Sequence, residues 1–141
     1  MKRIRIYGCT NKPNLKNQIR SASECFIQCL IPLKKKYDIT ITLYKNLLAE
    51  EEAYGECWCE NKNSFCLRIE KEMEMETIIK TLAHEFVHLK QFAKGELKFL
   101  NKHNMWNGRV FCHSSNYNNT PWEKEATEFE NLLFESWKQT L

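Results

Sequence analysis

Two histidines and a glutamate near the middle of the chain have the types and the spacing that metal-dependent hydrolysis requires. The stretch 81–88 contains His84, Glu85 and His88, which form the pattern HExxH. If this stretch is helical, the two histidines lie one turn apart on one face and can direct both imidazoles at a single metal ion. The glutamate beside them could then accept a proton from a metal-bound water. The pattern therefore predicts a zinc-dependent hydrolase, most simply a peptidase, with Glu85 as the catalytic base.

The sequence around the motif predicts the helix that the motif needs. Apolar residues recur at helical spacing on both sides of it, and no glycine or proline interrupts residues 73–94. Gly95 follows where a helix C-terminal cap is expected. The alternative is that both histidines are ordinary, hydrogen-bonded residues of a half-buried helix and that the motif is accidental.

A catalytic zinc site needs a third protein ligand, and the sequence offers two sources for it. One source is the acidic start of the last predicted helix, which contains Glu123 and Glu125. The other is a histidine of the preceding loop, either His103 or His113, because imidazole suits zinc equally well. On a helix the two glutamates would point about 200° apart, so that only one of them can face the metal. Acidic residues in a first helical turn can also do no more than favour the helix dipole.

Length and composition predict one small globular domain. The 141 residues are enough for one core but not for two, and 43% hydrophobic and 28% charged residues are ordinary values. A net charge of +3 is too small to indicate nucleic acid, and no apolar run approaches the length of a membrane span. Asp38 is the only aspartate among eighteen acidic residues, which excludes an aspartate dyad and an EF-hand.

The seven cysteines are predicted to be reduced thiols. Their number is odd and the N-terminal residues lack the apolar core of a secretory signal, so we expect a cytoplasmic protein. Cys57 and Cys59 form a CxC pair, which on a strand would face one side of a sheet and fill part of the core. A zinc-ribbon site would need a second pair of CxxC type, which the sequence lacks.

Hydrophobic periodicity predicts the remaining strands and helices. Alternating or β-rich segments predict strands at 3–7, 39–47, 54–60 and 64–70, the last two joined by a hairpin turn at 61–63. Helical spacing predicts helices over 15–33 and over 121–138, the latter capped by Thr120. Its buried stripe should consist of Trp122, Ala126, Phe129, Leu133 and Trp137.

These elements predict an α+β fold. We expect a mostly antiparallel sheet of three to four strands, packed on an N-terminal helix, the HExxH helix and a C-terminal helix. Residues 98–119 should be irregular, apart from one short strand at 109–112.

The segments HEFVH at 84–88 and PWEKEA at 121–126 together resemble a known family of enzymes. An HExxH helix followed by such an acidic helix start is similar to the gluzincin metallopeptidases, which include thermolysin-like enzymes, minigluzincins and the ImmA/IrrE type. The wider arrangement runs from residue 65 to residue 138 and includes HEFVHLKQFAKGEL and a Trp106-x-Gly108 loop. It is similar to small SprT-like and phage-encoded metallopeptidases.

The resemblance implies a zincin-like domain that binds one Zn²⁺ per chain through His84, His88 and Glu123. In gluzincins the ligating Glu is commonly followed by a small residue three positions later and a polar one four positions later, here Ala126 and Thr127. The family usually has Asp or Asn at the last position, where it holds a ligating histidine. A SprT-type site would instead use a loop histidine as its third ligand.

The implied mechanism needs further groups around the zinc. A donor besides zinc must stabilise the oxyanion, and the candidates in the loop before the last helix are His103, Arg109, His113 and Tyr117. Gln91, one turn past His88, could support the site or merely be solvated. In zincins the strand before the metal helix binds extended substrate by edge pairing, which assigns that role to the strand at 64–70.

The expected partner is a protein or peptide substrate, with no membrane and no nucleic acid involved. A repair protease linked to DNA would be a narrower form of the peptidase hypothesis, but the chain carries no added DNA-binding module. The alternative is a zinc-binding structural or interaction module of the same fold with little or no turnover, for example a virion-associated protein. The Lys- and Asn-rich composition would suit an AT-rich microbial or phage genome, which extends the expected location to the virion or the host cytoplasm.

Overall fold

The main sheet and the helices of the chain follow the predicted order closely. The computed structural model describes residues 2–31, 35–47, 54–100, 103–112 and 120–141. In chain order the elements are β1 (Lys2–Tyr7), α1 (Pro13–Leu30), β2 (Tyr37–Tyr44), β3 (Gly55–Asn61), β4 (Ser64–Glu70), α3 (Met75–Ala93), β5 (Leu97–Phe99), β6 (His103–Trp106), β7 (Arg109–Cys112) and α4 (Pro121–Lys138). The α+β class and the three predicted helices are confirmed.

The main sheet is mixed, which corrects the expectation of a mostly antiparallel sheet. Its strand order is β1-β2-β4-β3. β2 lies parallel to both β1 and β4, and only the hairpin of β3 and β4 is antiparallel. β2 alternates between buried and half-buried residues because the helices cover only one face of the sheet, and such alternation does not distinguish parallel from antiparallel neighbours.

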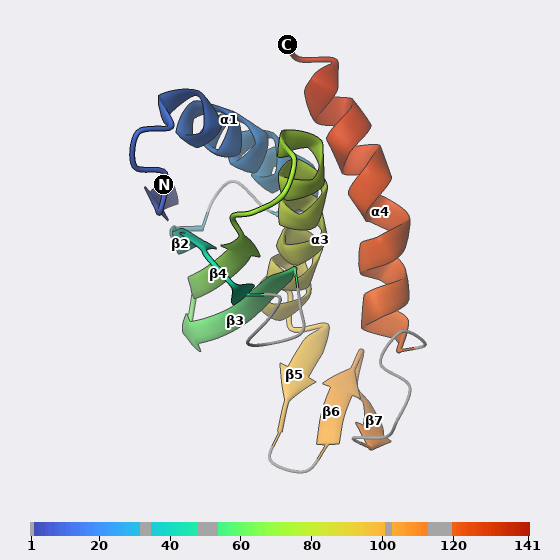
Figure 1. Cartoon of the computed structure of the whole chain (residues 1–141). Helices are drawn as coiled ribbons and strands as arrows, with labels where there is room; N and C mark the ends of the chain where they lie inside the picture. Colours follow the sequence, from blue (N-terminus) through green and yellow to red (C-terminus); the bar gives the residue numbers. More distant parts are fainter. Residues whose placement is uncertain (1, 32–34, 48–53, 101–102, 113–119) are drawn as a thin grey trace.

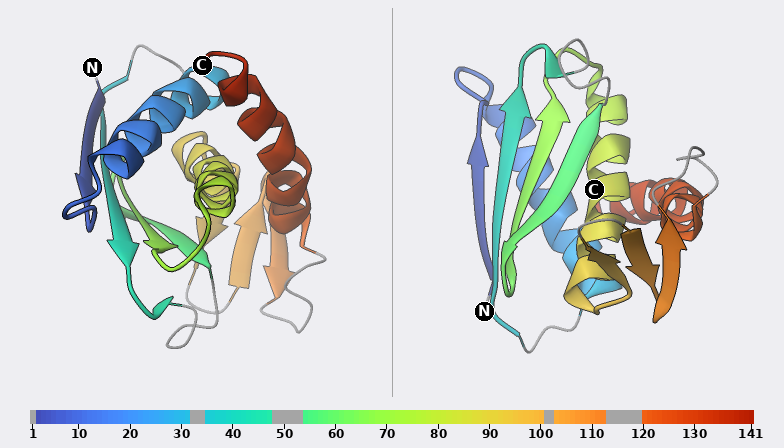
Figure 2. Two further views of the ribbon diagram at one scale, coloured as in Figure 1. Left: turned by 45° about the horizontal axis from the view of Figure 1, so that its top comes forward. Right: turned by 90° about the horizontal axis from the view of Figure 1, so that it is seen from below.

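All three helices lie on one side of this sheet (Figures 1 and 2). α1 and α3 form the layer next to the strands, and α4 packs along α3 and touches α1. Phe26 of α1 and Phe86 of α3 are fully buried and make an edge-to-face contact with ring centroids 6.0 Å apart. This packing holds α3 rigidly between the sheet and α4, which positions the HExxH residues.

The stripe by which α4 packs differs at one position from the prediction. Trp122, Ala126, Leu133 and Trp137 are buried as expected, but Phe129 is 43% exposed and Phe134 is buried instead. Glu123 is also buried in this stripe. The buried face of α4 therefore includes Glu123, the acidic residue in its first turn.

A second, three-stranded antiparallel sheet replaces part of the segment that we expected to be irregular. Its order is β5-β6-β7, and of its strands only β7 was predicted. Asn107 and Gly108 both have positive φ angles, 49° and 82°, and form the two-residue turn between β6 and β7. Asn-Gly between two short strand-like segments is a strong hairpin signal, and our prediction of an irregular segment did not take it into account.

The two cysteines of the CxC pair have different surroundings. Cys57 is half-buried on the helix side of β3, where its pKa is raised well above its usual value, mainly by burial. Cys59 is exposed, so the expectation that both thiols fill the core is wrong for Cys59.

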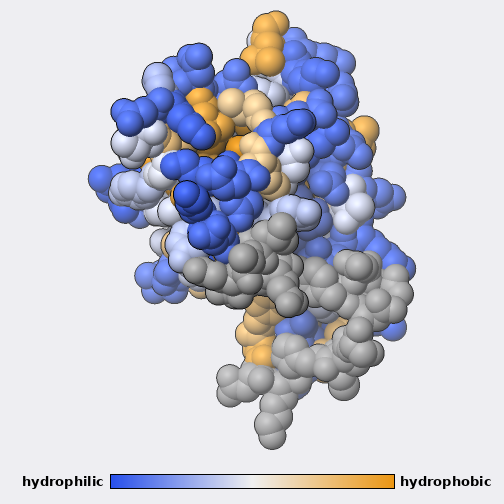
Figure 3. Space-filling model, viewed as in Figure 1, coloured by the Kyte–Doolittle hydropathy of each residue, from blue (hydrophilic) through white to orange (hydrophobic). Residues whose placement is uncertain are grey.

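The surface seen in Figure 3 is mostly hydrophilic, and its hydrophobic residues form small, separate patches. Among the described helices, none is both long enough and apolar enough to cross a membrane.

Candidate metal centre

The two motif histidines and the first acidic residue of α4 meet where α3 and α4 pack side by side (Figure 1). His84 and His88 lie one turn apart on the face of α3 that α4 covers. Glu123 projects from the first turn of α4 into the same space. One ligand atom from each of these residues lies within 4.8 Å of the other two, which is close enough to hold a metal ion.

The same nitrogen of each imidazole faces the carboxylate. His84 Nε2 is 3.0 Å from Glu123 Oε1, and His88 Nε2 is 2.8 Å from Glu123 Oε2. The exposed fractions of His88 and Glu123 are only 7% and 5%. Two neutral imidazoles and one carboxylate on a shared centre are a donor set that suits a divalent cation such as zinc.

His88 supplies an independent indication that this centre fits a cation. Its Nε2 is buried and forms no regular hydrogen bond among the described residues, and the Glu123 carboxylate 2.8 Å away pairs with it only when His88 is protonated, so the neutral imidazole has no partner there. A buried polar atom without a partner is costly. A cation between the histidines and the carboxylate would satisfy this nitrogen.

Gln91 determines which nitrogen of His88 is free to bind. The side chain is fully buried, and its Nε2 donates to the Trp122 carbonyl and to Glu125 Oε1, both at 3.0 Å. Because those two acceptors fix the orientation of the amide, Gln91 Oε1 is the atom that lies 2.8 Å from His88 Nδ1. In its neutral form His88 therefore carries its proton on Nδ1, which leaves the Nε2 lone pair directed at the centre.

Glu125 is turned away from the two histidines. It accepts a hydrogen bond from Lys90 Nζ at 2.7 Å, and Lys90 also pairs with Glu96 at 2.8 Å. With Gln91 as a further donor, these contacts hold the start of α4 against the end of α3. Of the two glutamates that could have faced the metal, the structure thus places Glu123 with the histidines.

Glu130, rather than Thr127, lies next to His84. Its Oε1 is 3.6 Å from His84 Nδ1, whereas Thr127 is exposed. The sequence reading missed Glu130. A spacing of seven residues from Glu123 places both on one face of a helix, and this was the signal that could have identified it.

In the metal-free centre the charged groups shift the pKa values of their neighbours. Burial alone would lower the pKa of His84, but the contacts with Glu123 and Glu130 outweigh it and raise this pKa to about 10. The pKa of His88 is also raised, by Glu123 and Glu85, against the effect of burial. Burial would raise the pKa of Glu123, yet the two histidines lower it to about 2.

Glu85 lies beside this group as a buried carboxyl. Only 6% of it is exposed, and burial raises its pKa to about 7, an effect that the neighbouring histidines partly offset. A carboxyl whose pKa lies near neutrality is suited to exchange protons at physiological pH. A cation bound next to it would favour the charged, basic form.

Gly55, at the start of β3, leaves the space that Glu85 occupies. A Cβ at this position would lie 2.8 Å from Thr81 Cγ2 and 3.1 Å from both Cγ and Oε2 of Glu85. The absence of a side chain on Gly55 therefore allows the Glu85 carboxylate to lie directly against the sheet edge.

We expect Gly55→Ala to destabilise the protein by about 1–3 kcal/mol, since an added methyl overpacks this contact. It should also displace the Glu85 side chain. Thermal unfolding measures the change, and the double variant Gly55→Ala with Thr81→Ser provides the control. Removing Thr81 Cγ2 takes away the closest clash, so the double variant should regain part of the loss. An unchanged unfolding temperature in Gly55→Ala would contradict the contact.

We expect Gln91→Leu to weaken metal binding by about 10-fold to 100-fold, because His88 would lose the acceptor that orients it. Competition with a chelator measures the affinity. Gln28→Leu is the matched control, since Gln28 is an exposed residue of α1. Equal zinc affinity in the wild type and Gln91→Leu would show that Gln91 does not orient the ligand.

The other predicted site residues do not join this group. His103 is half-buried in β6 and Arg109 is exposed in β7, and neither belongs to the metal-ligand cluster found among the described residues. His113 and Tyr117 lie outside the described residues. The second sheet instead supports the start of α4, since Trp106 and Phe111 pack on Trp122, with ring centroids 6.2 and 5.7 Å away.

The strand that we expected to pair with substrate lies inside the sheet. β4 is hydrogen-bonded to β2 on one side and to β3 on the other, so it has no free edge for an added strand. Within this hairpin the edge strand is β3, which also carries Gly55 next to Glu85. The pattern of a single strand does not show which of two hairpin strands lies at the edge.

Comparison with known proteins adds no relative: the chain matches no protein-family model, no curated protein and no solved structure.

Proposed function

We propose that the protein is a zinc-dependent metallopeptidase. The observation that carries this proposal is the convergence of His84, His88 and Glu123 on one centre, with the buried Glu85 carboxyl beside it. A structural zinc site usually has four protein ligands, whereas a catalytic one has three and leaves a position for water. Among the described residues the ligand set has three members, which favours hydrolysis over a purely structural metal.

Each residue of the centre would have a separate role in hydrolysis. His84, His88 and Glu123 would hold Zn²⁺, which supplies Lewis-acid activation of a water molecule when bound. Glu85 would accept the proton of that water as it attacks a peptide carbonyl, and would then deliver the proton to the leaving nitrogen. Gln91 and Glu130 would keep the two imidazoles oriented through their Nδ1 atoms.

The outer edge of β3, which pairs with no strand among the described residues, is the candidate surface for substrate. An extended peptide that hydrogen-bonds to this edge would run past Gly55 and bring a peptide bond close to Glu85. This would make the substrate a flexible or locally unfolded protein segment, because a segment already in a helix or sheet has no free backbone groups to pair.

Metal content and cleavage of a complex peptide mixture test the proposal together. We expect about one zinc per chain and cleavage products that disappear after chelation and return when zinc is restored. Bound zinc without any cleavage would favour the zinc-binding module without turnover. Absence of zinc, even after zinc is added, would overturn both functions.

A further inference from the structure

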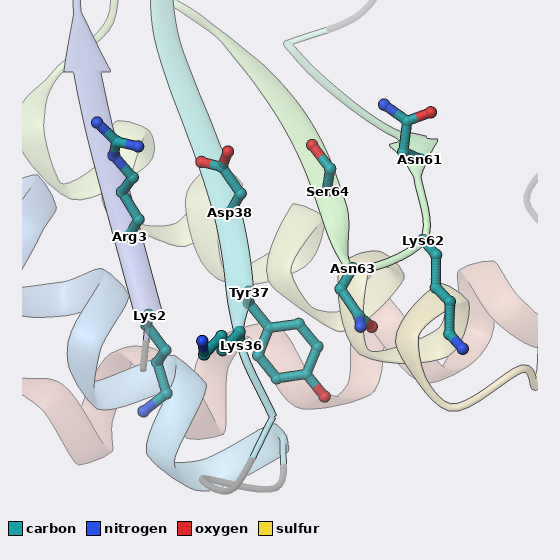
Figure 4. Close-up of a pocket in the computed structure, with 9 residues that line it drawn as sticks. All are labelled: Lys2, Arg3, Lys36, Tyr37, Asp38, Asn61, Lys62, Asn63 and Ser64. Atoms are coloured by element: carbon teal, nitrogen blue, oxygen red, sulfur yellow. The ribbon is translucent and has the colours of Figure 1, made fainter.

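A hollow of about 700 Å³ lies at one end of the main sheet, away from the candidate metal centre (Figure 4). The starts of β1 and β2 and the turn between β3 and β4 form its wall. Gly55 and Asn61 are at opposite ends of β3, about 20 Å apart at about 3.3 Å per residue, and only Asn61 lines the hollow. The volume is within the range of small-molecule pockets, so the hollow is a second candidate site.

The charged side chains of this hollow are mostly positive. Its wall contains Lys2, Arg3, Lys36 and Lys62, and Asp38 is its one acidic residue. We call it the basic hollow. The chain as a whole is nearly balanced, with 21 basic and 18 acidic residues, so four positive charges against one is a local concentration. Such a concentration in a concave surface attracts anions.

The four positive groups are available to a ligand. Within the described part of the chain none of them has an ion-pair partner, whereas Asp38 pairs with Arg5, whose Nη2 is 3.3 Å from Asp38 Oδ2. Lys36 and Lys62 lie at the ends of strands rather than within the sheet, where long side chains can move toward a bound group. Lysine and arginine side chains of this kind are typical ligands of phosphate.

Asp38 shows that a simple anion is not the best fit. In the strand register it lies between Arg3 on β1 and Ser64 on β4, and Figure 4 shows these three side chains on neighbouring strands. Its Oδ1 is buried, whereas 43% of the side chain as a whole is exposed. A ligand that carries hydroxyl or amino donors besides its phosphate would donate to the exposed part of this carboxylate, while a bare anion would be repelled by it.

We propose that the basic hollow binds a small phosphate ester with hydroxyl groups, such as a nucleotide. The phosphates would contact the lysines and Arg3, and a hydroxyl or amino group would donate to Asp38. The inference does not depend on the peptidase proposal, because no residue of the hollow belongs to the metal-binding cluster.

Titration of the purified protein with ATP, AMP and inorganic phosphate, followed by calorimetry and by amide NMR shifts, tests this inference. We expect the nucleotides to bind more tightly than phosphate and to shift the amides of residues 36–38 and 61–64. The variant Lys36→Glu with Lys62→Glu should weaken ATP binding by at least about tenfold. Lys45→Glu with Lys98→Glu changes the net charge equally at exposed positions outside the hollow and should bind ATP as the wild type does.

Four results would overturn the inference. The first is no binding of either nucleotide at millimolar concentration. The second is an equal loss of affinity in both double variants, which would show a general charge effect. The third is a set of NMR shifts centred on residues 84–88 and 123, which would place the nucleotide at the candidate metal centre. The fourth is equal affinity for phosphate and AMP, which would show a simple anion site rather than a site for a phosphate ester. Because the NMR shifts are measured on the wild type, they remain informative if a variant fails to fold.

Discussion

Replacing Glu85 with glutamine should abolish peptide cleavage while leaving the metal in place. The amide has nearly the same shape but cannot accept the proton of the attacking water, and loss of a general base costs about 100-fold to 10,000-fold in rate. Zinc content should stay at the wild-type level, because Glu85 is not one of the three residues whose ligand atoms converge. Cleavage of the substrate found in the peptide mixture measures the rate.

Glu128→Gln is the matched control for this substitution, since Glu128 is exposed on α4 and outside the metal-binding cluster. It should cleave as the wild type does. Full activity in Glu85→Gln would exclude Glu85 as the base. A loss of zinc in Glu85→Gln would show instead that the residue holds the site together.

The pH dependence of stability provides a second readout for Glu85 in the metal-free protein. Its pKa in the folded state, about 7, is above the value of 4.5 expected for an unfolded chain. A carboxyl with a raised pKa contributes stability that is full below 4.5 and is lost as the pH rises through about 7. Glu85→Gln lacks this change, so the gap between the two unfolding free energies should vary across that pH window.

Replacing Glu123 with alanine should remove the metal. The carboxylate contacts both imidazoles at 3.0 and 2.8 Å, so its loss deletes the one anionic ligand of the group. Loss of a residue that only supports a ligand already lowers metal affinity by about 10-fold to 100-fold, and we expect a larger loss here. Zinc content and chelator competition measure the effect, and His84→Ala should behave in the same way.

Glu125→Gln is the control that distinguishes the two glutamates. Glu125 binds Lys90 and Gln91, so its substitution should retain zinc stoichiometry even if it weakens the attachment of α4. Full zinc binding in Glu123→Ala together with its loss in Glu125→Gln would reverse the assignment of the third ligand.

Zinc affinity should rise with pH across the neutral range. The metal-free centre holds protons on its histidines, with the pKa of His84 at about 10 and that of His88 raised as well. Binding must displace these protons, so each one released changes the affinity by up to about tenfold per pH unit. A pH-independent affinity between pH 6 and 8 would show that the histidines are already neutral before the metal binds.

The same shifts define where the metal-free protein is most stable. A raised histidine pKa contributes stability below 6.5 that is lost as the pH rises through about 10. The lowered pKa of Glu123 contributes stability above 4.5 that is lost as the pH falls through about 2. The pairing of these residues therefore stabilises the metal-free fold most between pH 4.5 and 6.5.

Local sequence patterns were sufficient for the elements that carry the candidate site. The periodicity around HEFVH predicted a helix over 73–94, and α3 spans Met75–Ala93. Thr120 and Pro121 predicted the start of α4, and the hairpin turn at 61–63 lies between β3 and β4 as expected. These features depend on neighbours within a few residues, because backbone preferences, turn conformations and helical spacing are local properties.

Tertiary packing decided the features that join distant segments. Alternation along β2 could not show that its neighbours are parallel, or that β3 rather than β4 lies at the edge, because strand pairing is not local. Helix geometry limited the third ligand to one of two glutamates, but only the packing of α4 on α3 turned Glu123 toward the histidines and Glu125 toward Lys90. The role of Gln91 likewise depends on a carbonyl 31 residues away. The sequence alone thus determined which residues could do the chemistry, and the contacts between α3, α4 and β3 decided which of them meet.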